Sequence, residues 1–387
     1  MSGARRILAS VSPGEVRVAL LRGDALEEAW IERPARPDGV GDLHRGRVGA
    51  IAPAMAGAFV LLAGDETGFL PEAEAGPDRQ PIRRVVNEGQ VLAIRVIRAA
   101  QGGKGPRVSA RLSPAEAALA AAPPGAPRLL ARGPDAVLRL ALAHPDAAVA
   151  TDGLALAARL RGALGHDRVT YAAGPVFDDA LEAAFDTLAG PVVPLPGGGC
   201  ILVHPTPALT AIDVDAGATA GAADAQAVWR LNLAAVAEAA RQIRLRNLAG
   251  PILLDVAGLA LKRRGALAAP LAEALAPDPL ARLLGLGPLG LFEILRGRVH
   301  PPLHEVLGWP PSPLTHGLAA LRQAAREAAA VPGRRLALRA APAVLEALRA
   351  LPGALAEFAA GAGHALILRP DAASSGGPGL IEEATDG

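Results

Sequence analysis

Residues 209–217 read LTAIDVDAG, an apolar run that ends in two carboxylates, Asp213 and Asp215. A buried strand that surfaces with such a pair either makes a turn or holds a cation. A second buried run, PILLDVAG at 251–258, surfaces in the same way at Asp255. Both runs are predicted strands, and the chemistry at their ends decides what the chain does.

The segment between the two runs, residues 225–247, has the apolar spacing of one helix. A strand-helix-strand unit tends to place its strands side by side, so Asp213 and Asp255 could emerge at one edge. Adjacent carboxylates repel each other unless a cation lies between them, and Mg²⁺ suits an oxygen-only pair because it keeps most of its waters. In the alternative interpretation, each aspartate makes a local turn or caps a helix. For the pair, both interpretations stay open at this point.

The composition limits the classes of protein that the chain can be. Its 387 residues exceed one ordinary domain, and a hydrophobic content of 51% is enough for several cores. A net charge of +1 neither indicates nor excludes a polyanionic partner. Cys200 is the only cysteine, which excludes an intrachain disulfide and any zinc site built from two cysteines. Neither a signal peptide nor an apolar run long enough to span a membrane is evident, so a soluble cytoplasmic protein is expected.

Residues 43–112 consist of short strands separated by glycine turns, which is typical of a small closed barrel of the OB type. Phe59 and Phe69 lie on predicted strands of this barrel, with cationic side chains near them. Such an arrangement suits single-stranded nucleic acid, because rings stack on bases while cations follow the phosphates. In the alternative interpretation, both phenylalanines are barrel core. The neighbouring cations are Arg45, Arg47 and Lys104.

A basic run, Arg241, Arg244 and Arg246, lies at the end of the predicted helix 225–247. It either complements the helix dipole on a solvated face or contacts RNA. Upstream, residues 135–195 alternate between helical and strand patterns, which is typical of an α/β unit.

Taken together, these segments resemble the ribonuclease E/G family. The resemblance covers nearly the whole chain and rests on strings in the family's order and spacing: IERPAR, HRGRV, AGAFVLLAGDETGFLP, GGKGPRVSARLS, LPGGGCILV, ALTAIDVDAG, NLAAVAEAARQIRLRNLAGPILLDV and GLFEILRGR. It implies an endoribonuclease that cuts single-stranded A/U-rich RNA with Mg²⁺, or with Mn²⁺ as an alternative metal. The products would carry a 5′-phosphate and a 3′-hydroxyl.

The resemblance also implies roles for individual residues. Asp213 and Asp255 match the aspartates that hold the family's metal. The chain departs from the family at Asp215, where the family has Asn, and at Gly258, where a supporting carboxylate is lost. The predicted catalytic residues are Asp213, Asp255, Asp215 and Arg296, of which the last would help to hold the phosphate. The predicted RNA-binding residues are Phe59, Phe69, Lys104, Arg45, Arg47 and Arg244.

The implied architecture is a multidomain α/β chain. Its parts are a ribonuclease H-like domain at 1–37 and 135–195, an inserted OB-fold barrel at 38–112, a connector at 113–134, a DNase I-like catalytic domain at 196–312, a small C-terminal α/β domain at 313–371 and a disordered tail at 372–387. The connector stands in place of the family's 5′-monophosphate sensor. Zinc and a zinc-linked dimer are not expected, and the oligomeric state stays open.

Two rival interpretations remain. A non-catalytic RNA-binding paralogue would keep the barrel and the fold, with its chemistry blunted by Asp215 and by the carboxylate lost at Gly258. An unrelated α/β metabolic enzyme would require the matching strings to be coincidence. The paralogue and the nuclease differ in one test, because only the nuclease would cut RNA in a metal-dependent way.

Overall fold

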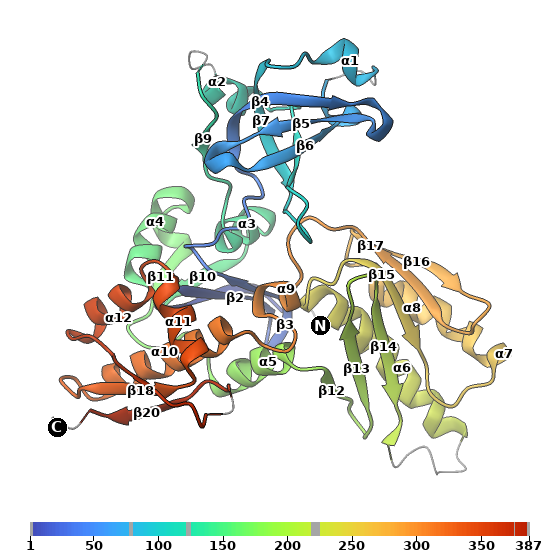
Figure 1. Cartoon of the computed structure of the whole chain (residues 1–387). Helices are drawn as coiled ribbons and strands as arrows, with labels where there is room; N and C mark the ends of the chain where they lie inside the picture. Colours follow the sequence, from blue (N-terminus) through green and yellow to red (C-terminus); the bar gives the residue numbers. More distant parts are fainter. Residues whose placement is uncertain (1–2, 77–79, 121–124, 218–224, 375, 385–387) are drawn as a thin grey trace. The chain divides into compact units, whose positions relative to one another are not determined.

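The computed structural model describes residues 3–76, 80–120, 125–217, 225–374 and 376–384 (Figure 1). The chain is a mixed α/β protein that divides into two compact units. The first unit comprises residues 1–37, 136–297 and 302–387, and the second comprises residues 38–135 and 298–301. Among the described residues, no helix has both the length and the apolarity needed to cross a bilayer.

The second unit is built on a closed five-stranded barrel in the order β4-β5-β6-β8-β7, with β7 pairing back onto β4. Closure leaves no free sheet edge in the barrel, and the architecture is consistent with an OB fold. Alternate side chains such as Val60, Ile94 and Val108 fill its interior. The bounds are β4 (Leu43–Ala52), β5 (Gly57–Leu61), β6 (Thr67–Pro71), α1 (Ile82–Val85), β7 (Val91–Arg98) and β8 (Arg107–Ser109).

The predicted connector at 113–134 contains regular structure that extends the second unit. Helix α2 (Pro114–Ala120) begins with a capping box, in which Glu116 N donates to Ser113 Oγ and Ser113 N donates to the Glu116 carboxylate. Strand β9 (Arg128–Ala131), which the sequence analysis did not predict, pairs with β4. Residues 121–124 of the connector lie outside the described part.

The first sheet of the first unit has the order β11-β10-β1-β2-β3, in which β1, β2 and β3 are antiparallel and β10 and β11 run parallel to β1. The Glu32 carboxylate at the end of β3 accepts a hydrogen bond from Ala136 N, at the start of α3. The bounds are β1 (Arg5–Ser12), β2 (Glu15–Arg22), β3 (Ala25–Glu32), α3 (Ala136–Ala143), β10 (Ala148–Thr151), α4 (Leu154–Leu164), β11 (Val169–Tyr171) and α5 (Asp179–Ala189).

The second sheet of the first unit has the order β12-β13-β14-β15-β17-β16 and carries the two aspartate-ended strands. Strands β14 and β15 are parallel neighbours, which confirms the predicted strand-helix-strand unit. Helices α6 and α8 pack on one face, against residues such as Ile212, Leu254 and Ile294. The bounds are β12 (Val192–Pro194), β13 (Cys200–Pro205), β14 (Thr210–Asp215), α6 (Ala225–Leu245), β15 (Gly250–Asp255), α7 (Leu261–Arg264), α8 (Ala268–Leu275), β16 (Ala281–Leu286) and β17 (Phe292–Arg296).

The C-terminal part forms a three-stranded sheet, β19-β18-β20, packed against helices. The prediction of a disordered tail at 372–387 is wrong for residues 380–383, because these form β20 and pair with β18. Glu382 of β20 forms ion pairs with Arg339 at 2.7 Å and Arg369 at 2.8 Å. Residues 375 and 385–387 lie outside the described part. The bounds are α9 (Leu303–Leu307), α10 (Pro313–Ala330), β18 (Leu336–Ala340), α11 (Pro342–Ala350), α12 (Ala354–Ala362), β19 (Ile367–Pro370) and β20 (Leu380–Glu383).

Candidate active site

Asp213 and Asp255 are direct register partners on the parallel strands β14 and β15. Their immediate neighbours Ile212 and Leu254 are buried against the helices, so strand alternation turns both carboxylates to the opposite face of the sheet. Asp213 is exposed, and the Asp255 side chain is 46% exposed. The fold therefore brings together the two residues that the sequence analysis paired, on a face that solvent reaches.

The two carboxylates differ in their partners. Within the described residues, no hydrogen bond or ion pair engages the Asp213 carboxylate. Asp255 Oδ1 accepts from Arg264 Nη1 at 2.6 Å. Arg264 is held by main-chain carbonyls as well, since it also donates to Leu259 O at 3.0 Å and Gly290 O at 2.8 Å. Arg264 thus fixes Oδ1 of Asp255, while Oδ2 has no hydrogen bond or ion pair among the described residues.

Sequence reasoning missed Arg264, although a signal was present. It closes the basic run LKRR of helix α7, residues 261–264, which follows β15 after a short loop. A basic run directly after an aspartate-ended strand indicates a counter-charge for that aspartate.

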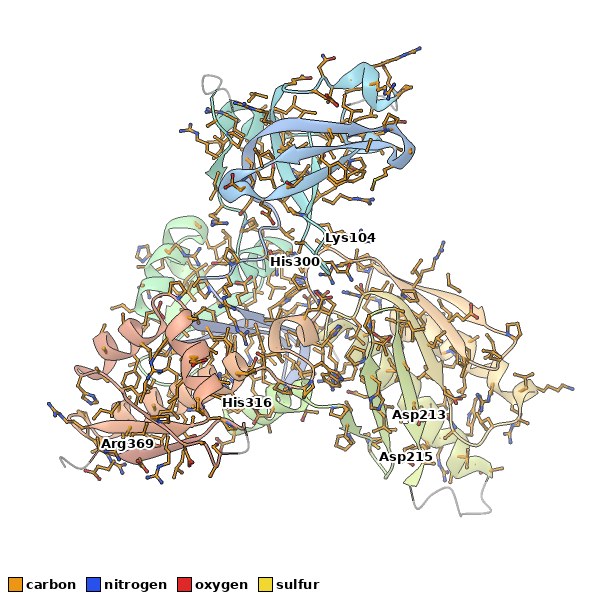
Figure 2. The ribbon with its side chains drawn as sticks, in the orientation of Figure 1. Lys104, Asp213, Asp215, His300, His316 and Arg369 are labelled. Carbon is orange, nitrogen blue, oxygen red and sulfur yellow. The ribbon has the colours of Figure 1, made fainter. Side chains whose placement is uncertain are left out.

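Asp215 lies two residues beyond Asp213 on β14, and Figure 2 labels both residues there. Its Oδ1 accepts a hydrogen bond from Gly217 N at 2.8 Å, so one of its oxygens stabilises a local turn. Across the sheet its register partner is Cys200. Burial raises the pKa of the Cys200 thiol, and the charges of Asp215 and Asp213 raise it further. The thiol therefore stays protonated at neutral pH and offers no thiolate ligand or nucleophile.

The chain just after Asp255 is held by a buried amide on α6. Asn232 is fully buried; its Nδ2 donates to Ala257 O at 2.9 Å and to Val228 O at 2.8 Å, and its Oδ1 accepts from Ala257 N at 3.0 Å. The next residue, Gly258, has a left-handed backbone with φ of +59°, where a side chain would be strained. Asn232 therefore fixes the position where β15 ends, and the sequence pattern alone gave no sign of this role.

The prediction that Arg296 holds the phosphate is wrong. Its side chain is only 6% exposed, and it donates to Asp278 at 2.7 Å, to Asn247 at 2.7 Å and to Leu248 O at 3.0 Å. Its register partner on β15 is Gly250, at the opposite end of the strand from Asp255. At about 3.3 Å per residue, that places the two ends roughly 16 Å apart. Arg296 is part of a buried ion pair that joins β17 to the chain after α8.

Arg244, a predicted RNA-binding residue, has a structural contact within the first unit. Its Nε donates to Glu27 O at 3.0 Å, which ties α6 to β3 of the first sheet. Neighbouring Arg246 is buried, and burial lowers its pKa to about 10 while it donates to Gln242 and to the carbonyl of Gly190. The basic end of α6 therefore joins parts of the first unit through Arg244 and Arg246, while the RNA contact of Arg244 stays a prediction.

On the barrel, Phe59 and Phe69 are direct register partners on β5 and β6, with ring centroids 5.5 Å apart in an edge-to-face arrangement. Phe59 is 36% exposed, and neither ring belongs to the buried barrel core. The alternative that both are core residues is therefore wrong. Lys104 is exposed at a tight Gly102-Gly103 turn between β7 and β8, in which Gln101 and Lys104 exchange main-chain hydrogen bonds of 2.9 Å.

The two predicted cations of β4 have different surroundings. Arg47 is exposed opposite Leu61 of β5, the strand that carries Phe59. Arg45 lies opposite Arg128 of β9, and its guanidinium lies beside Gly125. Of these two arginines, only Arg47 therefore lies beside β5, the strand that carries Phe59.

Among the described residues, no group of three or more His, Cys, Asp or Glu side chains is arranged to hold a metal ion. The Asp213–Asp255 pair is smaller than such a group. Mg²⁺ is commonly bound by one or two carboxylates together with substrate phosphates, while the rest of its shell stays water. The pair fits that ion as a site completed by phosphate oxygens.

Comparisons with known proteins give this geometry a context. A model of the ribonuclease E/G family matches residues 162–299, a range that contains both aspartates. The chain is 26% identical to ribonuclease G of Escherichia coli K12 over 451 residues, covering 89% of this chain and 92% of that protein. It is 25% identical to ribonuclease E of the same organism over 397 residues, covering 78% of this chain and 37% of that protein. Ribonuclease E of a Nostoc species is 37% identical over 131 residues, which cover 33% of this chain and 19% of that protein.

Proposed function

Because this chain belongs to the ribonuclease E/G family, we propose that it is a Mg²⁺-dependent endoribonuclease that cuts single-stranded, A/U-rich RNA. The observation that carries the proposal is the register pairing of Asp213 and Asp255, inside the segment that the family model matches. Two exposed carboxylates on adjacent strands repel each other, and a divalent cation shared with an RNA phosphate relieves that repulsion.

The residues of the site would have two roles, metal binding and orientation of a metal ligand. Asp213, with both oxygens available, and the free oxygen of Asp255 would hold the ion against the scissile phosphate. Arg264 keeps Asp255 oriented and balances part of its charge before RNA arrives. A bound Mg²⁺ would supply a Lewis acid for the phosphate and lower the pKa of the attacking water.

Asp215 would act indirectly. Because its Oδ1 is used by the turn at Gly217, it contributes charge close to Asp213 more than a further ligand. That charge favours the cation and disfavours the RNA phosphate.

We also assign the sheet β11-β10-β1-β2-β3 to a ribonuclease H-like domain and the sheet β12–β17 to a DNase I-like domain. Support for the first assignment is its three antiparallel strands followed by two parallel ones, with the barrel unit inserted between β3 and α3. Support for the second is the aspartate pair at its β14–β15 centre.

The test is cleavage of a labelled A/U-rich single-stranded RNA with Mg²⁺ or with EDTA. The variants are Asp213→Asn, Asp255→Asn and the control Asp186→Asn, an exposed aspartate on α5 of the same unit. The first two should lower the rate by more than about 100-fold, since even residues that only support metal ligands contribute 10- to 100-fold. The control should cut at the wild-type rate.

Comparing RNA that has a 5′-monophosphate with RNA that has a 5′-hydroxyl tests the connector. Equal rates are expected, because residues 113–134 replace the family's sensor. If the wild type binds RNA without cutting it, the chain is the RNA-binding paralogue, and the nuclease proposal is overturned.

A further inference from the structure

Four side chains form one row across the outside of the barrel. Phe59 on β5 is the register partner of Phe69 on β6, and Phe69 is the partner of Arg107 on β8. Arg107 is in turn the partner of Arg98 on β7. Neighbouring strands lie about 4.8 Å apart, so the three steps of this row span roughly 14 Å. Two aromatic rings are thus followed, in line, by two guanidinium groups.

The arginine half of the row carries positive charge that the protein does not neutralise. In the described part of the barrel unit, neither Arg98 nor Arg107 forms an ion pair with a carboxylate. Burial lowers the pKa of Arg98, and the nearby charges of Arg107 and Arg298 lower it further. Arg98 Nε is buried without a hydrogen-bond partner. Like charges brought together in this way favour a bound anion.

The backbone holds these groups in place. Gly105, between Lys104 and β8, lies so close to β6 that a side chain there would overlap Thr67 O, and Phe69 N donates to Pro106 O at 2.8 Å. At the base of the same hairpin, Ala99 N donates to Val299 O at 2.9 Å. This bond brings buried Arg298 to the hairpin, where its Nη2 donates to Ala100 O at 3.1 Å.

We propose that Arg98 and Arg107 bind the phosphates of a single-stranded RNA whose bases stack on Phe59 and Phe69. The strand would cross the barrel from β5 to β7. Phenylalanine rings in line with arginine guanidinium groups suit single-stranded RNA, because an unpaired strand exposes both its base faces and its phosphates. A duplex keeps its bases stacked inside and cannot offer them to the rings. The inference takes its ligand from the proposed function and adds a phosphate-binding half to the RNA site, which the sequence analysis did not predict.

The test is equilibrium binding of a fluorescein-labelled, A/U-rich RNA 12-mer to the full chain, followed by fluorescence anisotropy in EDTA over a range of salt concentrations. The variants are Arg98→Gln, Arg107→Gln and Arg98→Lys. The matched control is Arg84→Gln, which removes an exposed arginine on α1 of the same unit. Circular dichroism checks the fold, and each variant should give the wild-type spectrum.

Each phosphate contact to a single strand contributes about 0.7 to the slope of log affinity against log salt. Arg98→Gln and Arg107→Gln should each reduce the slope by about that amount, which is a loss of roughly fivefold over one decade of salt. Arg98→Lys should keep the slope because it keeps the charge, and Arg84→Gln should leave slope and affinity unchanged.

Several outcomes would overturn the inference. Slopes that stay at the wild-type value in both glutamine variants would do so, as would an equal loss in the Arg84→Gln control. If Phe59→Ala weakens binding while both arginine variants bind normally, the proposed function stands and the inference fails. If the wild type binds no single-stranded RNA at all, the proposed function itself fails.

Discussion

Replacing Arg296 with Met should destabilise the first unit, because the arginine is the positive half of a buried ion pair. Arg296 and Asp278 are 6% and 5% exposed, and their contact is 2.7 Å long. The guanidinium also donates to Asn247 Oδ1 and Leu248 O. Met fills most of the same space but donates to none of these three acceptors, so the Asp278 carboxylate is left buried without its counter-charge.

The magnitude follows from what remains after the substitution. Removing one partner of a buried ion pair typically costs about 3–5 kcal/mol. Asp278 keeps one hydrogen bond, from Leu280 N at 3.0 Å, so the lower end of that range, about 3 kcal/mol, is expected. Adding Asp278→Asn to Arg296→Met should recover part of the loss, because the amide removes the uncompensated charge and still accepts from Leu280 N.

The assay is urea unfolding followed by circular dichroism, with Arg282→Met as the control. Arg282 is exposed on β16 of the same sheet, so its loss should cost less than about 0.5 kcal/mol. RNA cleavage per folded molecule should be unchanged in Arg296→Met. Normal stability combined with a large fall in cleavage rate would refute the reasoning and return Arg296 to the active site.

Three further predictions concern other buried or exposed groups. Asn232→Ala removes three hydrogen bonds, so it should cost about 2–3 kcal/mol in urea unfolding and lower kcat by loosening Asp255; an unchanged unfolding midpoint would contradict this role. Phe59→Ala should weaken single-stranded RNA binding by about 1–3 kcal/mol in anisotropy titrations, with duplex binding unaffected, and an equal loss on both RNAs would argue against stacking. Although burial raises the pKa of Glu182, hydrogen bonds and charge from Arg17 and its neighbours lower it overall, below the usual 4.5. The ionised Glu182 carboxylate therefore stabilises the folded state fully above pH 4.5, and this contribution is lost as the pH falls towards the folded pKa. The thermal unfolding temperature of Glu182→Gln should consequently vary less between about pH 3 and pH 7 than that of the wild type.

Much of the candidate site could be predicted from the sequence because it depends on local patterns. Apolar runs that end at Asp213 and Asp255, with one helix between them, leave few topologies other than parallel neighbours. The period of two then places both aspartates on one face. The same period also indicates that Arg296 is buried, which the sequence analysis missed. Phe292, Ile294 and Arg296 alternate along β17 and share the face that packs against the core.

The tertiary structure decided which groups meet across long stretches of chain. Asp278 reaches Arg296, and β20 reaches β18, through pairings that no local pattern encodes, so a salt bridge appeared where a phosphate ligand was expected and a strand where a disordered tail was expected. The row from Phe59 to Arg98 likewise depends on the register of four strands and on an irregularity between Val96 and Arg98.

The sequence by itself therefore determined the two strands that end at Asp213 and Asp255, the pairing of these aspartates and the aromatic residues on the barrel strands, because each follows from the spacing of neighbouring residues. Only the fold determined the partners of the charges, namely Arg264 with Asp255, Arg296 with Asp278, and Arg98 with Arg107. The physical reason is that the interactions of a charged side chain depend on the groups that folding places within a few ångströms of it. Those groups can come from any part of the sequence.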